Sequence, residues 1–93
     1  MRNNRFEWDD AKAAGNLRKH RVSFVTACEA FDDPNSLEGP DDDPDEVRWK
    51  LTGMTTNGVL VVIHTERGAR HRIISARRAN GHEQAEYLRQ SRP

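Results

Sequence analysis

Lysine, histidine and arginine side chains that could move protons and bind anions gather in two segments of the sequence. The first segment holds Lys19 and His20 near the end of a predicted helix, where the helix dipole favours a cation. A histidine at this position could also donate or accept a proton near neutral pH. The residues alone leave both interpretations open, a cation that stabilises the helix end and a proton-transfer group.

The second segment, residues 63–78, places histidine, glutamate and arginine among apolar residues on a predicted hairpin. In a regular second strand Arg72 shares one face with Ile74, and Arg77 shares the other face with Ile73. An arginine on each face of a half-buried sheet costs free energy unless one lies at an edge or lines a cleft. The pattern predicts that Arg72 or Arg77 lines a cleft, and a salt bridge at the sheet rim is the alternative.

Both arginines can line one cleft only if the strand twists, bulges or releases Arg77 into the following loop. We expect Arg77 to leave the strand for the loop, because it closely precedes Asn80 and Glu83. These two residues match the capping box at the start of a helix. The sequence thus predicts that the strand ends near Arg77.

The acidic and histidine-containing stretches do not match metal-binding motifs. The aspartates at 41–45 resemble the start of a calcium loop, but Glu46 stands where a glycine is needed. His82 opens a zincin-like helix pattern whose second ligand position is Glu86. A single cysteine, Cys28, excludes an internal disulfide and a cysteine-based zinc site. With no phosphate-binding glycine loop either, the sequence predicts no metal and no cofactor.

Local patterns predict the elements that position these residues. Capping residues mark three helix starts, Asn57-Gly58 marks a hairpin turn, and the apolar run 59–63 is typical of a central strand. The expected elements are a short strand at 6–8, helices at 10–20 and 24–31, a brief strand near 37, strands at 47–52, 59–63 and 70–77, and a helix after 80. We expect an α+β fold, in which two N-terminal helices pack on a small antiparallel sheet of three long strands plus the short N-terminal strand.

Length and composition fit one small domain that spans residues 1–93. The chain has 93 residues, of which 34% are hydrophobic and 32% charged, so its core must be thin. No apolar run is long enough for a membrane helix, and the first residues lack the apolar stretch of a signal peptide. We therefore expect a cytoplasmic protein without a membrane partner.

A net charge of zero hides an uneven distribution of charge along the chain. Through Val47 there are 6 Lys or Arg residues against 12 Asp or Glu, whereas from Arg48 onward there are 9 against 3. The two halves therefore carry about −6 and +6. Eight of the nine cations in the second half are arginines, a bias that indicates an anionic partner.

Short motifs in a fixed order carry a resemblance to a known family: Phe6-Glu7-Trp8-Asp9 with Lys12, Asn16-Leu17-Arg18-Lys19-His20, Val22-Ser23-Phe24, Phe31-Asp32-Asp33-Pro34, Arg48-Trp49, and Arg72-Ile73-Ile74-Ser75-Ala76-Arg77. On these motifs, which cover nearly the whole chain, the sequence resembles the BrnT-type toxins of bacterial toxin–antitoxin pairs. One departure is Arg21, because members of that family often have a glycine after the Lys-His pair.

The resemblance implies a RelE-like fold and a ribonuclease that inhibits translation. It also implies a BrnA-type antitoxin, which neutralises the toxin and whose other half binds DNA and represses the operon. RNA cleavage without a metal needs a proton acceptor, a proton donor and a group that stabilises charge on the phosphate. A ribosome-bound substrate would bring further groups to the site.

On this hypothesis the candidate residues take three roles. His20 or His64 would transfer protons, with Glu66 as an alternative base, and Arg72 and Arg77 would stabilise the phosphate charge. Lys19 would position the RNA backbone, and the substrate-binding candidates are Lys12, Arg67, Arg70 and Arg78. The competing hypothesis is a module that binds nucleic acid or protein through the arginine-rich hairpin face without catalysis.

Overall fold

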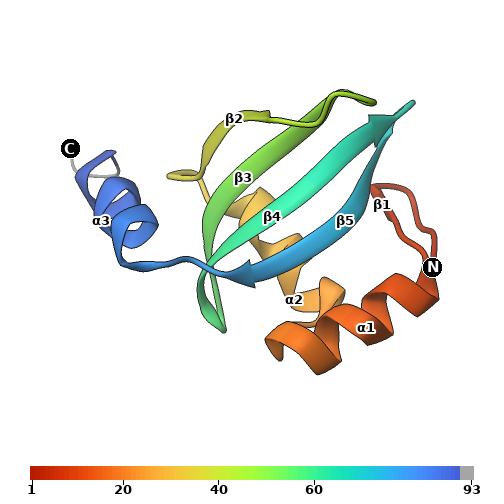
Figure 1. Ribbon diagram of the computed structural model, residues 1–93, viewed down its shortest axis with the longest axis horizontal. Coiled ribbons are helices and arrows are strands. Elements are labelled where there is room, and N and C mark those ends of the chain that lie inside the picture. The colour runs from red at the N-terminus through yellow and green to blue at the C-terminus, as the bar shows by residue number, and fades with distance from the viewer. Residues whose placement is uncertain (91–93) are drawn as a thin grey trace.

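The computed structural model describes residues 1–90 of the chain. Its elements are, in order, β1 (Phe6–Glu7), α1 (Asp10–His20), α2 (Phe24–Ala27), the 3-10 helix η1 (Cys28–Asp32), β2 (Leu37–Asp41), β3 (Arg48–Thr55), β4 (Gly58–Arg67), β5 (Arg70–Arg78) and α3 (Gly81–Gln90). The strands form one five-stranded sheet in the order β1-β5-β4-β3-β2. Figure 1 shows α1 and α2 together beside the sheet and α3 at the far end of the strands.

The predicted α+β class, with two N-terminal helices on the sheet and a C-terminal helix, is confirmed. Two details differ from the prediction. The short strand β1 pairs with β5 in parallel, so the sheet is mixed rather than purely antiparallel. The segment near Leu37 is a full strand that pairs with β3 along its five residues, because the acidic loop starts only after Asp41.

The predicted helix over 24–31 is also divided, since α2 ends at Ala27 and the chain continues as the tighter helix η1. The segment packs closely against β3 at Gly53. A Cβ added at Gly53 would come within 2.8 Å of the carbonyl oxygen of Ala30, so only glycine lets the two backbones approach this closely.

The local signals at helix ends and turns are confirmed. Asp9 and Ser23 accept hydrogen bonds from backbone N–H groups in the first turns of α1 and α2. Asn80 and Glu83 bond reciprocally, each side chain accepting from the other residue's backbone N–H. Gly58 in the predicted hairpin turn has a φ of 83°. These features depend on neighbouring residues alone, so the sequence suffices to predict them.

A bulge in β5 decides on which face its arginines lie. Ile63 pairs with Ser75 but His64 pairs with Ile73, so Ile74 is the extra residue in the ladder. Arg77 remains within the strand, paired with Val61, and the prediction that it is released into a loop is wrong. The bulge shifts the alternation by one residue and puts Arg72 and Arg77 on the same face of the sheet.

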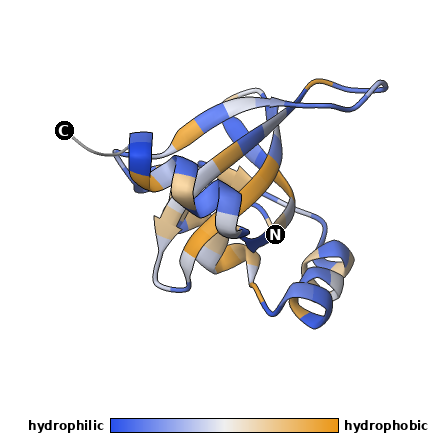
Figure 2. Ribbon diagram, turned by 60° about the vertical axis from the view of Figure 1, so that its left-hand side comes forward, coloured by the Kyte–Doolittle hydropathy of each residue, from blue (hydrophilic) through white to orange (hydrophobic). Residues whose placement is uncertain are grey.

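The hydrophobic core fills the space between α1, α2 and η1 and the face of the sheet that they cover. Figure 2 shows that the strands carry long hydrophobic stretches, whereas the helical ribbons are mostly hydrophilic. The core cluster consists of Phe6, Trp8, Val22, Phe24, Ala27, Ala30, Leu51, Leu60, Val62, Ile73 and Ala76. Among the described residues, no helix has both the length and the apolar character that a membrane crossing requires.

Polar contacts attach helix α3 to Asp33, which follows η1, and through Asp33 to β3. The Tyr87 hydroxyl donates to the carboxylate of Asp33 over 2.5 Å, and the same oxygen accepts the backbone N–H of Met54 in β3. Burial, together with this carboxylate, raises the pKa of Tyr87 to about 12, so the hydroxyl keeps its proton and remains a donor.

The side chain of Asn16 joins α1 to the edge of β5. It is the one buried residue of α1, and its amide nitrogen donates to the carbonyl oxygens of Val22 and Ala76 over 2.9 and 2.8 Å. Its amide oxygen accepts the N–H of Ala76 over 3.1 Å. The Asn16 amide therefore bonds to the outer edge of β5 as a peptide group of a further strand would. The amide nitrogen donates both of its hydrogens, and the amide oxygen accepts one hydrogen bond.

We expect Asn16→Asp to destabilise the protein by at least about 3 kcal/mol, because a carboxylate cannot donate to the two carbonyl oxygens and would be buried against them. Urea unfolding followed by circular dichroism measures this loss. The matched control is Asn4→Asp, an exposed position that should change stability by no more than about 0.5 kcal/mol. Equal stability of the two variants would contradict the proposed importance of the Asn16 amide.

Candidate functional site

The sheet has one face that α1, α2 and η1 leave uncovered, and we call it the open face. Paired residues in neighbouring strands point to the same side of a sheet, so the register identifies its members. On β3, β4 and β5 they are Arg48, Lys50, Thr52, Met54, Val59, Val61, Ile63, Thr65, Arg67, Arg70, Arg72, Ser75 and Arg77. Six of these side chains are cationic, and four of the six, Arg48, Lys50, Arg72 and Arg77, form ion pairs with carboxylates.

The carboxylate of Glu83 binds two of these cations at the end of the open face. Both terminal nitrogens of Arg77 donate to it over 2.7 and 2.9 Å, and the Lys50 ammonium lies 2.8 Å from Oε2. The hydrogen bond from Arg77 is the main reason that the pKa of Glu83 lies far below its ordinary value, and it raises the pKa of Arg77. Two cations thus converge on one anionic group.

A second ion pair joins Glu7 and Arg72 across the parallel pairing of β1 with β5. The Arg72 guanidinium donates to Glu7 Oε2 over 2.7 Å. This hydrogen bond is the main cause that lowers the pKa of Glu7. Both side chains keep some exposure, 17% for Glu7 and 29% for Arg72, so a ligand on the open face can reach them.

Another cation of the open face, Arg48, is held by the acidic loop. Its Nη1 donates to Asp43 over 2.7 Å, and its Nε lies 3.4 Å from a carboxylate oxygen of Asp41. The backbone N–H of Asp45 is the largest cause that lowers the pKa of Asp43, and Arg48 adds to it. The acidic loop is therefore ordered around an arginine of β3.

A cavity of about 170 Å³ adjoins the Lys50–Glu83 pair, between α3 and the strands β2 and β3. Its size suits a small ligand more than a large one. It is lined by Leu37, Glu38, Gly39, Pro40, Lys50, Thr52, Glu83 and Glu86.

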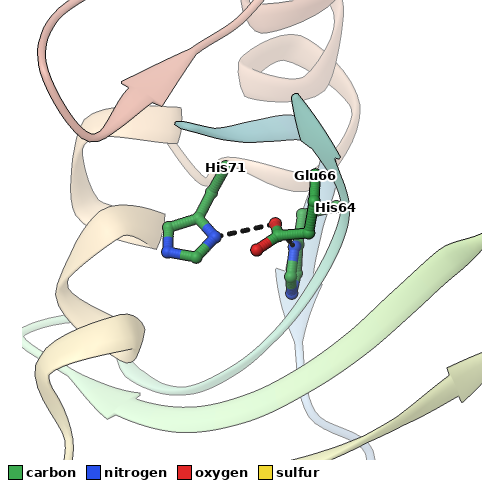
Figure 3. Close-up of side chains that lie close together, drawn as sticks. All are labelled: His64, Glu66 and His71. Atoms are coloured by element: carbon green, nitrogen blue, oxygen red, sulfur yellow. Dashed lines mark hydrogen bonds and ion pairs between the residues drawn. The ribbon is translucent and has the colours of Figure 1, made fainter. Parts of the chain in front are cut away.

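A different group of titratable side chains lies on the covered face of the hairpin. His64 and His71 both direct Nδ1 at Oε2 of Glu66, over 3.1 and 2.8 Å (Figure 3). His64 is only 1% exposed, and burial is the main cause that lowers its pKa. It therefore does not reach the open face.

The remaining predicted residues take no part in the ion pairs of the open face or in the histidine cluster. Lys12, Lys19 and His20 belong to α1, which packs against β5 on the covered side. Arg67 and Arg70 pair at the tip of the β4–β5 hairpin, at the end of the open face far from Arg77.

At the other end of β5, Arg78 donates to the side chain of Asn57 over 2.7 Å. The structure thus brings Arg72 and Arg77 onto one face and His64 beside Glu66 on the other, and it does not unite the whole predicted set.

Glu7, Arg48 and Lys50 were not among the site residues expected from the sequence. Arg48 and Lys50 alternate with apolar Trp49 and Leu51, a pattern that shows they share a face but not which face is open. Glu7 meets Arg72 only through the pairing of two strands at opposite ends of the chain. That pairing leaves no mark in the local sequence.

These observations define a class of protein, a small α+β fold that offers an anion-binding face of arginine and lysine side chains with carboxylates beside them. Residues 8–83 match the family model described as the ribonuclease toxin, BrnT, of type II toxin–antitoxin systems. The match covers most of the chain, so the chain belongs to this family, as the resemblance indicated. The family implies an antitoxin partner and an RNA substrate. No curated protein matches the chain.

We expect Glu83→Gln to lower the free energy of unfolding by about 1–2 kcal/mol at neutral pH, because Arg77 and Lys50 lose a charged acceptor. The carboxylate has a lowered pKa in the folded state, so its contribution is present above the unfolded pKa of about 4.3 and is lost as the pH falls further. The stability difference between parent and variant should therefore shrink between about pH 4 and pH 2.

Urea unfolding at a series of pH values measures this convergence. Glu86→Gln, in the same helix and partly exposed, is the control and should show little difference at any pH. A constant difference between parent and Glu83→Gln down to pH 2 would contradict the ion-pair explanation.

Proposed function

We propose that the open face binds RNA and cleaves it without a metal ion, and that the reacting phosphate lies against Arg72 and Arg77. The observation that carries the proposal is the group of cations on the uncovered face of the sheet, four of which lie beside carboxylates. Guanidinium groups match two phosphate oxygens at once and remain charged at every physiological pH.

Cleavage of this kind makes the ribose 2′-hydroxyl attack the neighbouring phosphorus. The 2′-hydroxyl loses a proton, the leaving 5′-oxygen gains one, and the intermediate phosphate carries an extra negative charge. Arginines placed where that charge develops stabilise the transition state more than the ground state. The products are a 2′,3′-cyclic phosphate and a 5′-hydroxyl.

Glu7 is the proton acceptor in this proposal. Its carboxylate is bound to Arg72 in the free protein, and this bond keeps its pKa low. When Arg72 turns to a phosphate, Glu7 loses its main stabilising donor and its pKa rises, so substrate binding itself produces a stronger base. His20, His64 and Glu66, the candidates from the sequence, lie on α1 or on the covered side of the sheet.

The proton donor is Lys50, because the histidines of β4 and β5 both lie on the covered face. A ribosome-bound RNA would add groups of the ribosome to this face and ease the donor step. Because translation takes place in the cytoplasm, a toxin that acts on translation would act there too.

The antitoxin in this proposal is of the BrnA type, and it neutralises the toxin by covering the open face. An acidic segment would replace the carboxylates of Glu7 and Glu83 as the acceptor for Arg72 and Arg77. The excess of cations after Val47 favours such a segment over a basic one.

We expect purified protein to cleave RNA in the presence of a chelator, and Arg72→Lys and Arg77→Lys each to lower the rate by roughly 10–1000-fold. Lysine keeps the charge but loses the paired donors that match phosphate oxygens. Gel analysis of end-labelled RNA measures the rate, and melting temperatures confirm that the variants fold. Arg89→Lys, an exposed residue of α3, should cleave as the parent does.

Three results would each overturn this mechanism. One is loss of all cleavage in the chelator with recovery on addition of a divalent metal. Another is unchanged cleavage by both lysine variants. The third is that neither the parent nor any variant cleaves RNA, while replacing arginines one by one lowers the affinity for RNA in small steps. That result would establish the non-catalytic binding module instead.

We expect the complex with the antitoxin to protect the backbone of β3–β5 from hydrogen exchange and to be inactive on RNA. Comparison of exchange in the free toxin and in the complex locates the covered surface. Protection confined to the loop at 42–46, with the open face exchanging as before, would contradict occlusion of the site.

A further inference from the structure

We propose that His64, Glu66 and His71 form a binding site for Zn²⁺ on the covered face of the β4–β5 hairpin. One ligand atom from each residue, an imidazole nitrogen or a carboxylate oxygen, lies within 4.8 Å of the other two. This site lies on the side of the sheet opposite to the proposed RNA site and is independent of it.

The distances between the ligand atoms fit a four-coordinate zinc ion after a small expansion. His64 Nδ1 and His71 Nδ1 lie 3.1 and 2.8 Å from Glu66 Oε2. Zinc bonds of about 2.0–2.1 Å in a tetrahedron need ligand separations of roughly 3.3 Å. Each imidazole nitrogen thus needs to move away from the Glu66 oxygen by only about 0.2–0.5 Å, and the two nitrogens already lie within 4.8 Å of each other.

Strand pairing and aromatic packing hold these side chains in place before a metal binds. Glu66 pairs with His71 across the hairpin, and Phe31 packs against both imidazole rings, with centroids 4.9 Å from His64 and 4.6 Å from His71. Preorganised ligands lose little conformational entropy on binding. Figure 3 shows that the nitrogen of each ring points at the same carboxylate.

The second ring nitrogen of His64 has a carboxylate in reach, as is usual for a histidine that binds zinc. His64 Nε2 is buried without a hydrogen-bond partner, and the nearest carboxylate oxygen, from Glu38 in β2, lies 3.9 Å away. A histidine that binds zinc through Nδ1 carries a proton on Nε2, which is commonly donated to a carboxylate. A movement of Glu38 by about 1 Å would complete this arrangement and satisfy the buried nitrogen.

Two imidazoles and one carboxylate are donors that suit zinc, and they leave the fourth position to water. The exposed fractions of His71 and Glu66, 31% and 47%, give the ion a path from solvent. Bound zinc would replace the shared hydrogen bonds by three metal bonds and link β4 to β5 and, through the packing of Phe31, to η1. We expect this link to stabilise the hairpin.

Competition with a chromophoric zinc chelator tests the site in tag-free protein. We expect one equivalent of Zn²⁺ to be withdrawn from the chelator and the melting temperature to rise with added Zn²⁺ but not with Mg²⁺. His71→Ala and Glu66→Gln should each weaken zinc binding by at least about tenfold, and Glu38→Gln should weaken it less. Both ligand residues are partly exposed, so these variants should fold, and circular dichroism checks that they do.

The control is His82→Ala, which removes an exposed histidine of α3 outside the cluster and should bind zinc as the parent does. Failure of the parent to compete for zinc would overturn the proposal, as would equal zinc binding by His71→Ala and the parent. RNA plays no part in these measurements, so a failure here leaves the proposed cleavage untouched, and the reverse also holds.

Discussion

The buried amide of Asn16 is the interaction on which the arrangement of the two faces depends. Beyond its short pairing with β1, β5 is the edge of the sheet, and its backbone groups at Ala76 need partners there. Asn16 supplies them from α1, and its other hydrogen bond fixes the chain at Val22 before α2 begins. Both helices are thereby held on one side of the sheet, and the opposite side remains free for chemistry.

The uneven charge along the chain is largely balanced within the fold. Carboxylates of the acidic half bind arginines of the basic half, as Glu7 binds Arg72 and Asp43 binds Arg48. A partner that binds the open face therefore meets cations already paired with carboxylates and must compete with them. Phosphate can do so because it offers several oxygens to one guanidinium, and each carboxylate that it displaces becomes more basic.

Local signals predicted much of the fold, but they could not predict which residues meet. The caps Asp9 and Ser23 and the turn at Gly58 involve neighbours in the chain, and the structure confirms them. The pairing of Glu7 with Arg72 depends on strand order, which no local pattern encodes. Arg21 lies between these cases: its φ of 58° explains physically why a glycine is favoured there, although no local pattern in this chain indicates that conformation.

The bulge at Ile74 shows how one residue separates two kinds of chemistry along a single strand. In a regular strand that kept Arg72 on the open face, Arg77 would point into the core beneath α1, where an unpaired guanidinium would be strongly destabilising. The extra residue returns Arg77 to the open face and leaves His71 and Ile73 on the covered face. His71 and Arg77, which a regular strand would place on the same face, therefore lie on opposite faces only because the ladder is interrupted between them.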